Sequence, residues 1–103
     1  GPNAVLQPFS RVGAGCIVNT GTVLEHHASL GDNVHLAPRA VVCGQAQVGA
    51  DSMVGAGAVV LQGLRVAEAT TLGAGAVLTQ TVAAPGETWL GNPARLAGAL
   101  ARA

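Results

Sequence analysis

The sequence has no lysine and no tyrosine, and it holds only one phenylalanine and one tryptophan among 103 residues. Half of the residues are nevertheless hydrophobic, mainly valine, leucine and alanine. A core of ordinary width usually takes several aromatic rings, because these side chains bury the most area per residue. We therefore expect a narrow interior built from repeated small aliphatic side chains.

Charge is also scarce, since five arginines balance five acidic residues and the formal net charge is zero. Without a basic patch, neither nucleic acid nor an anionic membrane surface is an expected partner. No apolar run approaches the ~20 residues of a membrane span. Cys16 and Cys43 fit neither a disulfide framework nor a metal site, so we expect packing roles for them, no metal, and a reducing cytoplasmic location.

An aliphatic residue recurs at every sixth position from residue 6 to residue 78. The side chain four positions further on is usually small, as at Ala28 and Ala46, and glycine often follows the aliphatic residue directly, as at Gly49 and Gly55. The thirteen aliphatic positions are Leu6, Val12, Val18, Leu24, Leu30, Leu36, Val42, Val48, Val54, Val60, Val66, Leu72 and Leu78.

A period of six matches neither the 3.6-residue period of a helix nor the alternation of an ordinary strand, but it is typical of a parallel β-helix. Three hexads make one triangular coil of 18 residues, so residues 18 apart stack at roughly the 4.8 Å spacing of paired strands. We expect an all-β domain over residues 3–83, with about four coils, three inward aliphatic columns, and glycines that relax the backbone at the corners.

The repeat ends near Ala84, where Pro85-Gly86 predicts a turn, and Gly91-Asn92-Pro93 predicts a second one. We expect residues 84–103 to form a short capping tail that folds over the last coil, with Trp89 as a plug, because uncovered strand edges invite aggregation. The first hexad begins almost at residue 1, so we expect the chain to be cut from something longer.

Four stretches carry a resemblance to a known family: "IVNTGTVLEHHASLGDNVHLAP", "CGQAQVGADSMVGAGAVV", "LGAGAVLTQTV" and "GNPARL". The chain resembles the left-handed β-helix hexapeptide-repeat acyltransferases, and within them the sugar O- and N-acetyltransferases of the sialic-acid and bacillosamine pathways. The left-handed sense of the coil is implied by this resemblance alone. The resemblance also implies acetyl-CoA as co-substrate, a homotrimer with active sites between subunits, and a separate N-terminal nucleotide-sugar-binding domain that is not part of these 103 residues.

The resemblance places the catalytic base at His26, after Glu25 in the family's "EH[ED]" element. The family usually has a carboxylate directly after this histidine, whereas this chain has His27. Either Glu25 or a neighbouring subunit then orients the base, or the base is weaker, or the chain is not a competent catalyst. Asn19 matches the asparagine of the family's "NT" element, which lies near the acceptor.

A second family histidine, close to the acetyl-CoA, corresponds to His35. The remaining positions that the resemblance assigns to the coenzyme groove and its nucleotide end are Gly44, Ala56, Gly73, Ala74, Asn92, Pro93 and Arg95.

The residues themselves support outward-facing histidines, because Leu24 and Ala28 take the inward positions of their hexad. A neutral imidazole accepts a proton near neutral pH, as acetyl transfer to an amine or hydroxyl requires. The resemblance makes the Gly44 N–H our candidate donor to the oxyanion. The plainer interpretations stay open: an exposed polar turn at His26, an exposed strand histidine at His35, and a corner residue at Asn19.

We therefore expect an enzyme that moves an acetyl group from acetyl-CoA to an amino or hydroxyl group of a sugar, and the resemblance implies that this sugar is nucleotide-linked. Two alternatives remain. One is a non-catalytic β-helix that serves as a trimerisation or scaffold module. The other, a zinc enzyme like the γ-type carbonic anhydrases, requires a His-x4-His pair, and this chain spaces its histidines by one and nine.

Overall fold

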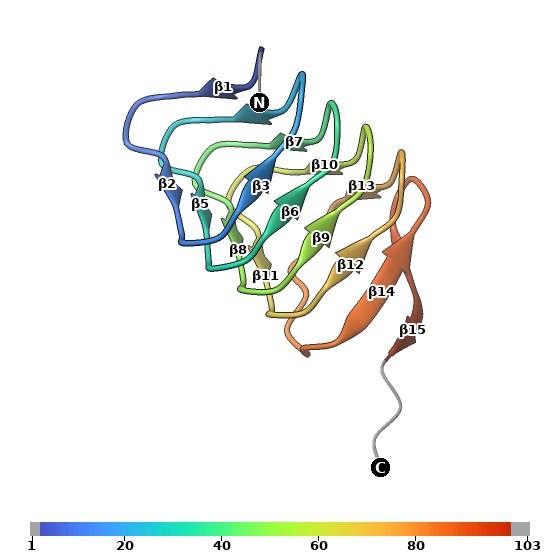
Figure 1. Cartoon of the computed structure of the whole chain (residues 1–103). Helices are drawn as coiled ribbons and strands as arrows, with labels where there is room; N and C mark the ends of the chain where they lie inside the picture. The colour runs from blue at the N-terminus through green and yellow to red at the C-terminus, as the bar shows by residue number, and fades with distance from the viewer. Residues whose placement is uncertain (1–2, 100–103) are drawn as a thin grey trace.

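Each hexad folds as a two-residue strand followed by a four-residue corner, and the strands stack from turn to turn (Figure 1). The computed structural model describes residues 3–99, and within them it contains strands but no helix. The strands are β1 (Val5–Leu6), β2 (Arg11–Val12), β3 (Ile17–Val18), β4 (Val23–Leu24), β5 (Ser29–Leu30), β6 (His35–Leu36), β7 (Val41–Val42), β8 (Gln47–Val48), β9 (Met53–Val54), β10 (Val59–Val60), β11 (Arg65–Val66), β12 (Thr71–Leu72), β13 (Val77–Leu78), β14 (Glu87–Leu90) and β15 (Arg95–Ala99).

Three sheets form the faces of a triangular parallel solenoid. Face A consists of β1, β4, β7, β10 and β13, face B of β2, β5, β8 and β11, and face C of β3, β6, β9, β12, β14 and β15. Residues 18 apart are register partners, as in Leu6 with Leu24 and Leu24 with Val42. The fold class and the three aliphatic columns predicted from the hexads are therefore confirmed.

The solenoid has about five turns, whereas the sequence predicts about four. The difference arises because β13 begins a fifth turn whose corners are shorter than the repeat. Val82 pairs with Val66 in the place that strict spacing gives to Ala84. Trp89 then pairs in register with Leu72, and its ring lies against the core at 9% exposure.

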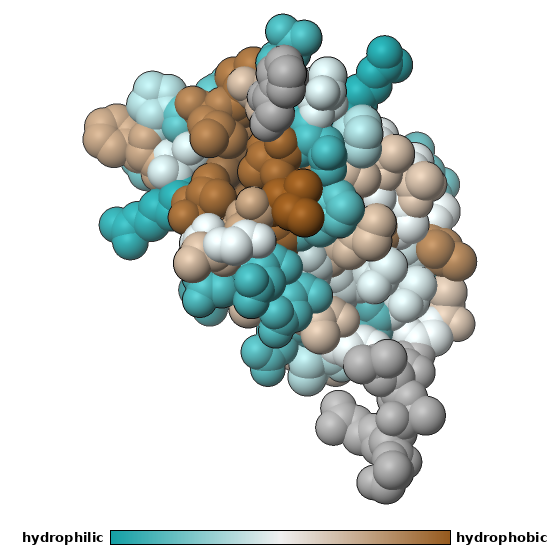
Figure 2. Space-filling model, in the orientation of Figure 1, coloured by the Kyte–Doolittle hydropathy of each residue, from teal (hydrophilic) through white to brown (hydrophobic). Residues whose placement is uncertain are grey.

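The aliphatic columns are buried from the second turn onward, and Leu24, Leu36 and Leu78 are fully enclosed. In the first turn the same hexad positions are open, with Leu6 at 52% and Val12 at 41% exposure, because no other described strand lies over them. Figure 2 shows the hydrophobic residues gathered at this end of the solenoid.

The glycines that follow the aliphatic residues do not have the role predicted for them. Gly49 and Gly55 lack the left-handed backbone conformation, which instead occurs two residues later, at Asp51 and Gly57. A Cβ at Gly55 would lie 2.7 Å from the Ala74 nitrogen, and one at Gly49 would lie 2.5 Å from the Glu68 nitrogen. These glycines are needed because the next turn passes too close for a side chain.

Candidate active site

Glu25, His26 and His27 occupy the corner between β4 and β5, and the corner closes with a hydrogen bond from the Ala28 N–H to the Glu25 carbonyl oxygen. Gly44 lies one solenoid turn later, at the corner position equivalent to that of His26. Its N–H donates to Glu25 Oε1 at 2.9 Å. The Gly44 N–H is therefore free for the oxyanion role predicted from the sequence only when Glu25 releases it.

The two adjacent histidines face each other on the surface. His26 Nδ1 and His27 Nδ1 are 3.1 Å apart, and the two rings are nearly perpendicular, with centroids separated by 5.3 Å. One Nδ1 must carry the proton and the other must accept it. When His26 is the donor, its Nε2 is the unprotonated nitrogen and is able to accept a proton.

The His27 side chain is held in place by residues from the preceding turn of the solenoid. Its φ of 62° is in the left-handed region, and its ring stacks on Phe9 with centroids 5.2 Å apart and planes 16° apart. Phe9 occupies the same corner position one turn earlier, with φ also 62°. The Gln7 side chain adds a second contact by accepting the His26 N–H at 3.2 Å.

Asn19 and His35 form a separate pair on the side of face C. Asn19 Nδ2 donates to the Leu36 carbonyl oxygen at 2.9 Å and lies 2.9 Å from His35 Nε2. Because an amide nitrogen is a donor, the His35 Nε2 is the acceptor and its Nδ1 carries the proton. Both residues are half-buried, so His35 is not simply an exposed strand residue.

The other predicted coenzyme residues line the corner between faces C and A. Ala56 and Ala74 are exposed there, and the tail residues Asn92, Pro93 and Arg95 are exposed beyond them.

The glycines near this corner differ in how closely the chain covers them. A Cβ built on Gly73 would clash with the side chain of Leu90, so this tail residue covers Gly73. Gly57 and Gly75 beside this corner have open space around them.

The predicted site residues therefore fall into two groups. One is the base corner, with Glu25, His26, His27 and Gly44, and the other is the groove corner, with His35, Ala56, Gly73, Ala74 and the tail. Within residues 3–99, no hydrogen bond or ring contact joins the two groups. They flank opposite edges of face A.

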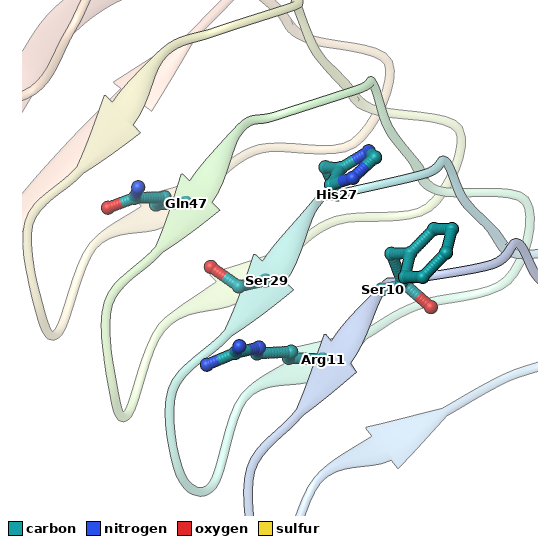
Figure 3. A pocket seen from close by; sticks show the side chains of 6 residues that line it. Ser10, Arg11, His27, Ser29 and Gln47 are labelled. Atoms are coloured by element: carbon teal, nitrogen blue, oxygen red, sulfur yellow. The ribbon is translucent and has the colours of Figure 1, made fainter.

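A pocket of about 390 Å³ opens beside His27 and was not anticipated from the sequence (Figure 3). The residues that line it are Phe9, Ser10, Arg11, His27, Ser29 and Gln47. The 18-residue spacing could have predicted this pocket. It stacks Phe9 on His27 and aligns Arg11, Ser29 and Gln47 in one outward column.

Neither cysteine is arranged as a nucleophile. Burial raises the pKa of the Cys43 thiol, and the negative charge of Glu25 raises it further by a smaller amount. Cys16 donates its thiol hydrogen to the Gly31 carbonyl oxygen at 3.1 Å.

In residues 3–99 no group of three or more His, Cys, Asp or Glu side chains is placed to hold a metal ion. The same residues contain no helix that is long and apolar enough to cross a membrane.

The repeat matches a known family model. The bacterial transferase hexapeptide family (six repeats) matches residues 27–62. No curated protein sequence matches the chain. Solved structures, by contrast, include several that are similar over nearly its whole length.

The acetyltransferase domain of PglB from Neisseria gonorrhoeae, in complex with acetyl coenzyme A, is similar with a TM-score of 0.76 and 34% identity, over 94% of this chain and 53% of that one. A histidine-to-asparagine variant of perosamine N-acetyltransferase from Caulobacter crescentus, in complex with CoA and GDP-perosamine, gives 0.78 and 27%, over 94% and 54%. Serine acetyltransferase from Neisseria gonorrhoeae gives 0.88 and 26%, over 98% and 42%.

These similarities confirm the resemblance to hexapeptide-repeat acyltransferases that the motifs indicate, with sugar acetyltransferases among the structural neighbours. The chain spans about half the length of the PglB acetyltransferase domain and of the perosamine N-acetyltransferase. The neighbours include a serine acetyltransferase as well as the perosamine N-acetyltransferase, so acetyl transfer is what they share.

Proposed function

We propose that this chain is the catalytic β-helix of an acetyl-CoA-dependent sugar acetyltransferase, with His26 as the general base. The observation that carries the proposal is the hydrogen bond between His26 Nδ1 and His27 Nδ1 on a solenoid whose structural neighbours include an acetyl-CoA complex. The acceptor is a sugar amine or hydroxyl, in line with the neighbour that is in complex with GDP-perosamine. The sugar is nucleotide-linked.

His26 Nε2 takes the proton from the attacking amine or hydroxyl as that atom forms its bond to the acetyl carbonyl carbon. Bound acetyl-CoA supplies the acetyl group as an activated thioester, and breaking the carbon–sulfur bond releases CoA. The proton held on His26 is then available to the departing thiolate. This chemistry needs neither a metal nor a covalent enzyme intermediate.

His27 takes the orienting role that a carboxylate has in the resembled family. In the tautomer in which His26 Nδ1 carries the hydrogen, His27 Nδ1 accepts it at 3.1 Å, which keeps the proton off His26 Nε2 and fixes the direction of the ring. Glu25 is less suited to that role because its Oε1 already accepts the Gly44 N–H. Stacking on Phe9 holds the His27 ring in place.

The position of the two groups of site residues supports a homotrimer with shared active sites. The outward residues of face A are all valine, namely Val5, Val23, Val41, Val59 and Val77. An apolar stripe of this length favours contact with another copy. Since the base corner and the groove corner flank this face, packing copies through it brings the base corner of one copy to the groove corner of the next.

Acetyl-CoA fits the groove corner, where Ala56 and Ala74 are small and exposed and where Gly57 and Gly75 have open space. His35, whose Nδ1 hydrogen is left free by its contact with Asn19, would donate to the coenzyme. Asn92, Pro93 and Arg95 would approach its nucleotide end, and Asn19 would lie near the acceptor.

The test is His26→Ala in a form of the protein that turns over an amino-sugar or nucleotide-sugar acceptor. Because the general base contributes about 10²-fold or more, transfer should fall by that factor. Acetyl-CoA binding, measured by calorimetry, should remain, since the groove corner is untouched. Failure of the wild-type trimer to bind acetyl-CoA would instead favour the scaffold alternative.

A further inference from the structure

The pocket beside His27 is lined along one wall by the outward side chains of face B. Arg11, Ser29 and Gln47 come from β2, β5 and β8, which are adjacent parallel strands in register. Successive members of such a column lie roughly 4.8 Å apart. Figure 3 shows them as a row that runs along the face, with His27 at the corner above it.

The stacked pair of Phe9 and His27 also lines the pocket. Because His27 also holds His26 through its Nδ1, the pocket lies directly against the proposed catalytic pair. Phe9 is 77% exposed, so most of an apolar ring is presented beside polar groups. A ring face next to hydroxyl and amide groups suits a sugar, which has both apolar C–H faces and hydroxyl edges.

The charge of the pocket favours an anion. Arg11 lines it, and no Asp or Glu is among the lining residues. Within residues 3–99 the Arg11 guanidinium has no ion-pair or hydrogen-bond partner. Ser10, Ser29 and Gln47 contribute hydroxyl and amide groups that hydrogen-bond either oxygen atoms of an anion or sugar hydroxyls. Guanidinium groups bind carboxylates and phosphates with paired hydrogen bonds.

We propose that this pocket is the acceptor subsite and that it takes a sugar bearing a negatively charged group, a phosphate or a carboxylate, held by Arg11. The inference rests on the proposed function for the identity of the reaction, but the binding site stands on the pocket residues. Ser29 and Gln47 bind the hydroxyl groups, and the His27 wall directs the acceptor toward His26. The pocket volume of about 390 Å³ is sufficient for a monosaccharide derivative.

The experiment is calorimetric titration of the intact 103-residue protein with glucose 1-phosphate, glucuronate, glucose and inorganic phosphate. The charged sugars should bind at least about 10-fold more tightly than glucose, because hydrogen bonds to a charged group contribute about 1.5–3 kcal/mol. Tighter binding of glucose 1-phosphate than of glucuronate identifies phosphate as the charged group, and the reverse order identifies a carboxylate. Inorganic phosphate should bind more weakly than glucose 1-phosphate, since it leaves the hydroxyl contacts unused.

Arg11→Gln removes the charge and should weaken binding of the preferred charged sugar about 10-fold, while leaving glucose unchanged. Arg65→Gln is the matched control, because Arg65 is an exposed outward residue of the same face and does not line the pocket. An equal loss in both variants would overturn the proposal, since it would mean diffuse attraction to the whole face. Equal affinity of wild-type protein for glucose and the charged sugars would overturn it without the use of any variant.

Acetyl-CoA titration of the same sample separates the two proposals. If acetyl-CoA binds but charged sugars have no preference over glucose, the subsite is wrong and the acetyltransferase proposal stands. If charged sugars bind through Arg11 and acetyl-CoA does not bind, the subsite stands and the proposed function is wrong.

Discussion

An imidazole in the place of a carboxylate changes how the proposed base, His26, is held. A carboxylate can only accept a hydrogen bond, whereas a neutral imidazole donates at one nitrogen and accepts at the other. In the proposed mechanism, His27 orients His26 only while its Nδ1 is unprotonated, and its ring must stay in the direction that the stack with Phe9 sets. The acceptor nitrogen and the ring are separable properties, and substitutions can remove one while keeping the other.

His27→Asn should keep much of the activity, because an amide oxygen accepts in place of Nδ1 and asparagine tolerates the left-handed conformation of this corner. His27→Phe should lower kcat roughly 10-fold to 100-fold with little change in the KM for acetyl-CoA, since it removes the acceptor that orients the base. Steady-state kinetics of both variants measure the split between kcat and KM.

A phenylalanine should fit at position 27 without strain, because the chain already has Phe9 at the equivalent corner position with the same φ. His27→Glu restores the carboxylate of the resembled family and should also remain active. Loss of activity in the asparagine and glutamate variants, with activity kept in the phenylalanine variant, would show that the ring itself, and not its acceptor nitrogen, is required.

Cys43 should react slowly with iodoacetamide near neutral pH. Burial and then the charge of Glu25 raise the pKa of its thiol, so the reactive thiolate is suppressed below that raised pKa and appears as the pH increases through it. The alkylation rate at pH 8, followed by mass spectrometry, should be lower in the folded protein than in protein unfolded by guanidinium. Glu25→Gln removes the smaller cause and should increase the folded rate modestly. A folded rate that matches the unfolded one would contradict this account.

At the level of the elements, glycine is required where one turn passes over the next. Gly55→Ala places a Cβ 2.7 Å from both the Ala74 nitrogen and the Leu72 carbonyl oxygen, so the backbone of the next turn must shift. Overpacking of this kind costs about 1–3 kcal/mol of the free energy of unfolding. Urea denaturation of the variant measures this loss.

Gly98→Ala in β15 is the control, because a Cβ there meets nothing within 4 Å. Its unfolding free energy should stay within about 0.5 kcal/mol of the wild type. If both variants were equally stable, the turns would be more loosely packed than the contacts at Gly55 imply.

The hexad pattern predicted the elements well because each inward aliphatic residue has a register partner 18 positions away, as Leu36 has in Val54. It failed where the chain leaves the strict spacing, so Val82 and not Ala84 continues its column. The pairing of His26 with His27 was not predictable either, because it depends on the left-handed φ of His27 and on Phe9 behind it. The roles of Asn19, His35 and the groove residues remain predictions.

On the scale of the whole molecule, the two edges of face A hold different halves of the proposed chemistry. The base corner has the proposed proton acceptor, and the groove corner has the small residues Ala56 and Ala74 proposed to contact acetyl-CoA. A single chain keeps these halves apart, so a copy that lacks one half should be rescued by a copy that lacks the other. Two inactive variants can therefore report on the assembly in a way that neither can alone.

Mixing His26→Ala with Ala74→Trp should restore activity after the two proteins are unfolded and refolded together. Ala74 is exposed at the groove corner, so tryptophan there should block acetyl-CoA without disturbing the core. Random assembly of trimers from equal amounts gives intact sites in about a quarter of the interfaces, so about a quarter of the wild-type rate is expected. The control has both substitutions on one chain and is refolded alone, and it should remain inactive because every site then lacks both halves. A mixture no more active than its two parents would mean that each copy acts within itself, and the shared site would have to be abandoned.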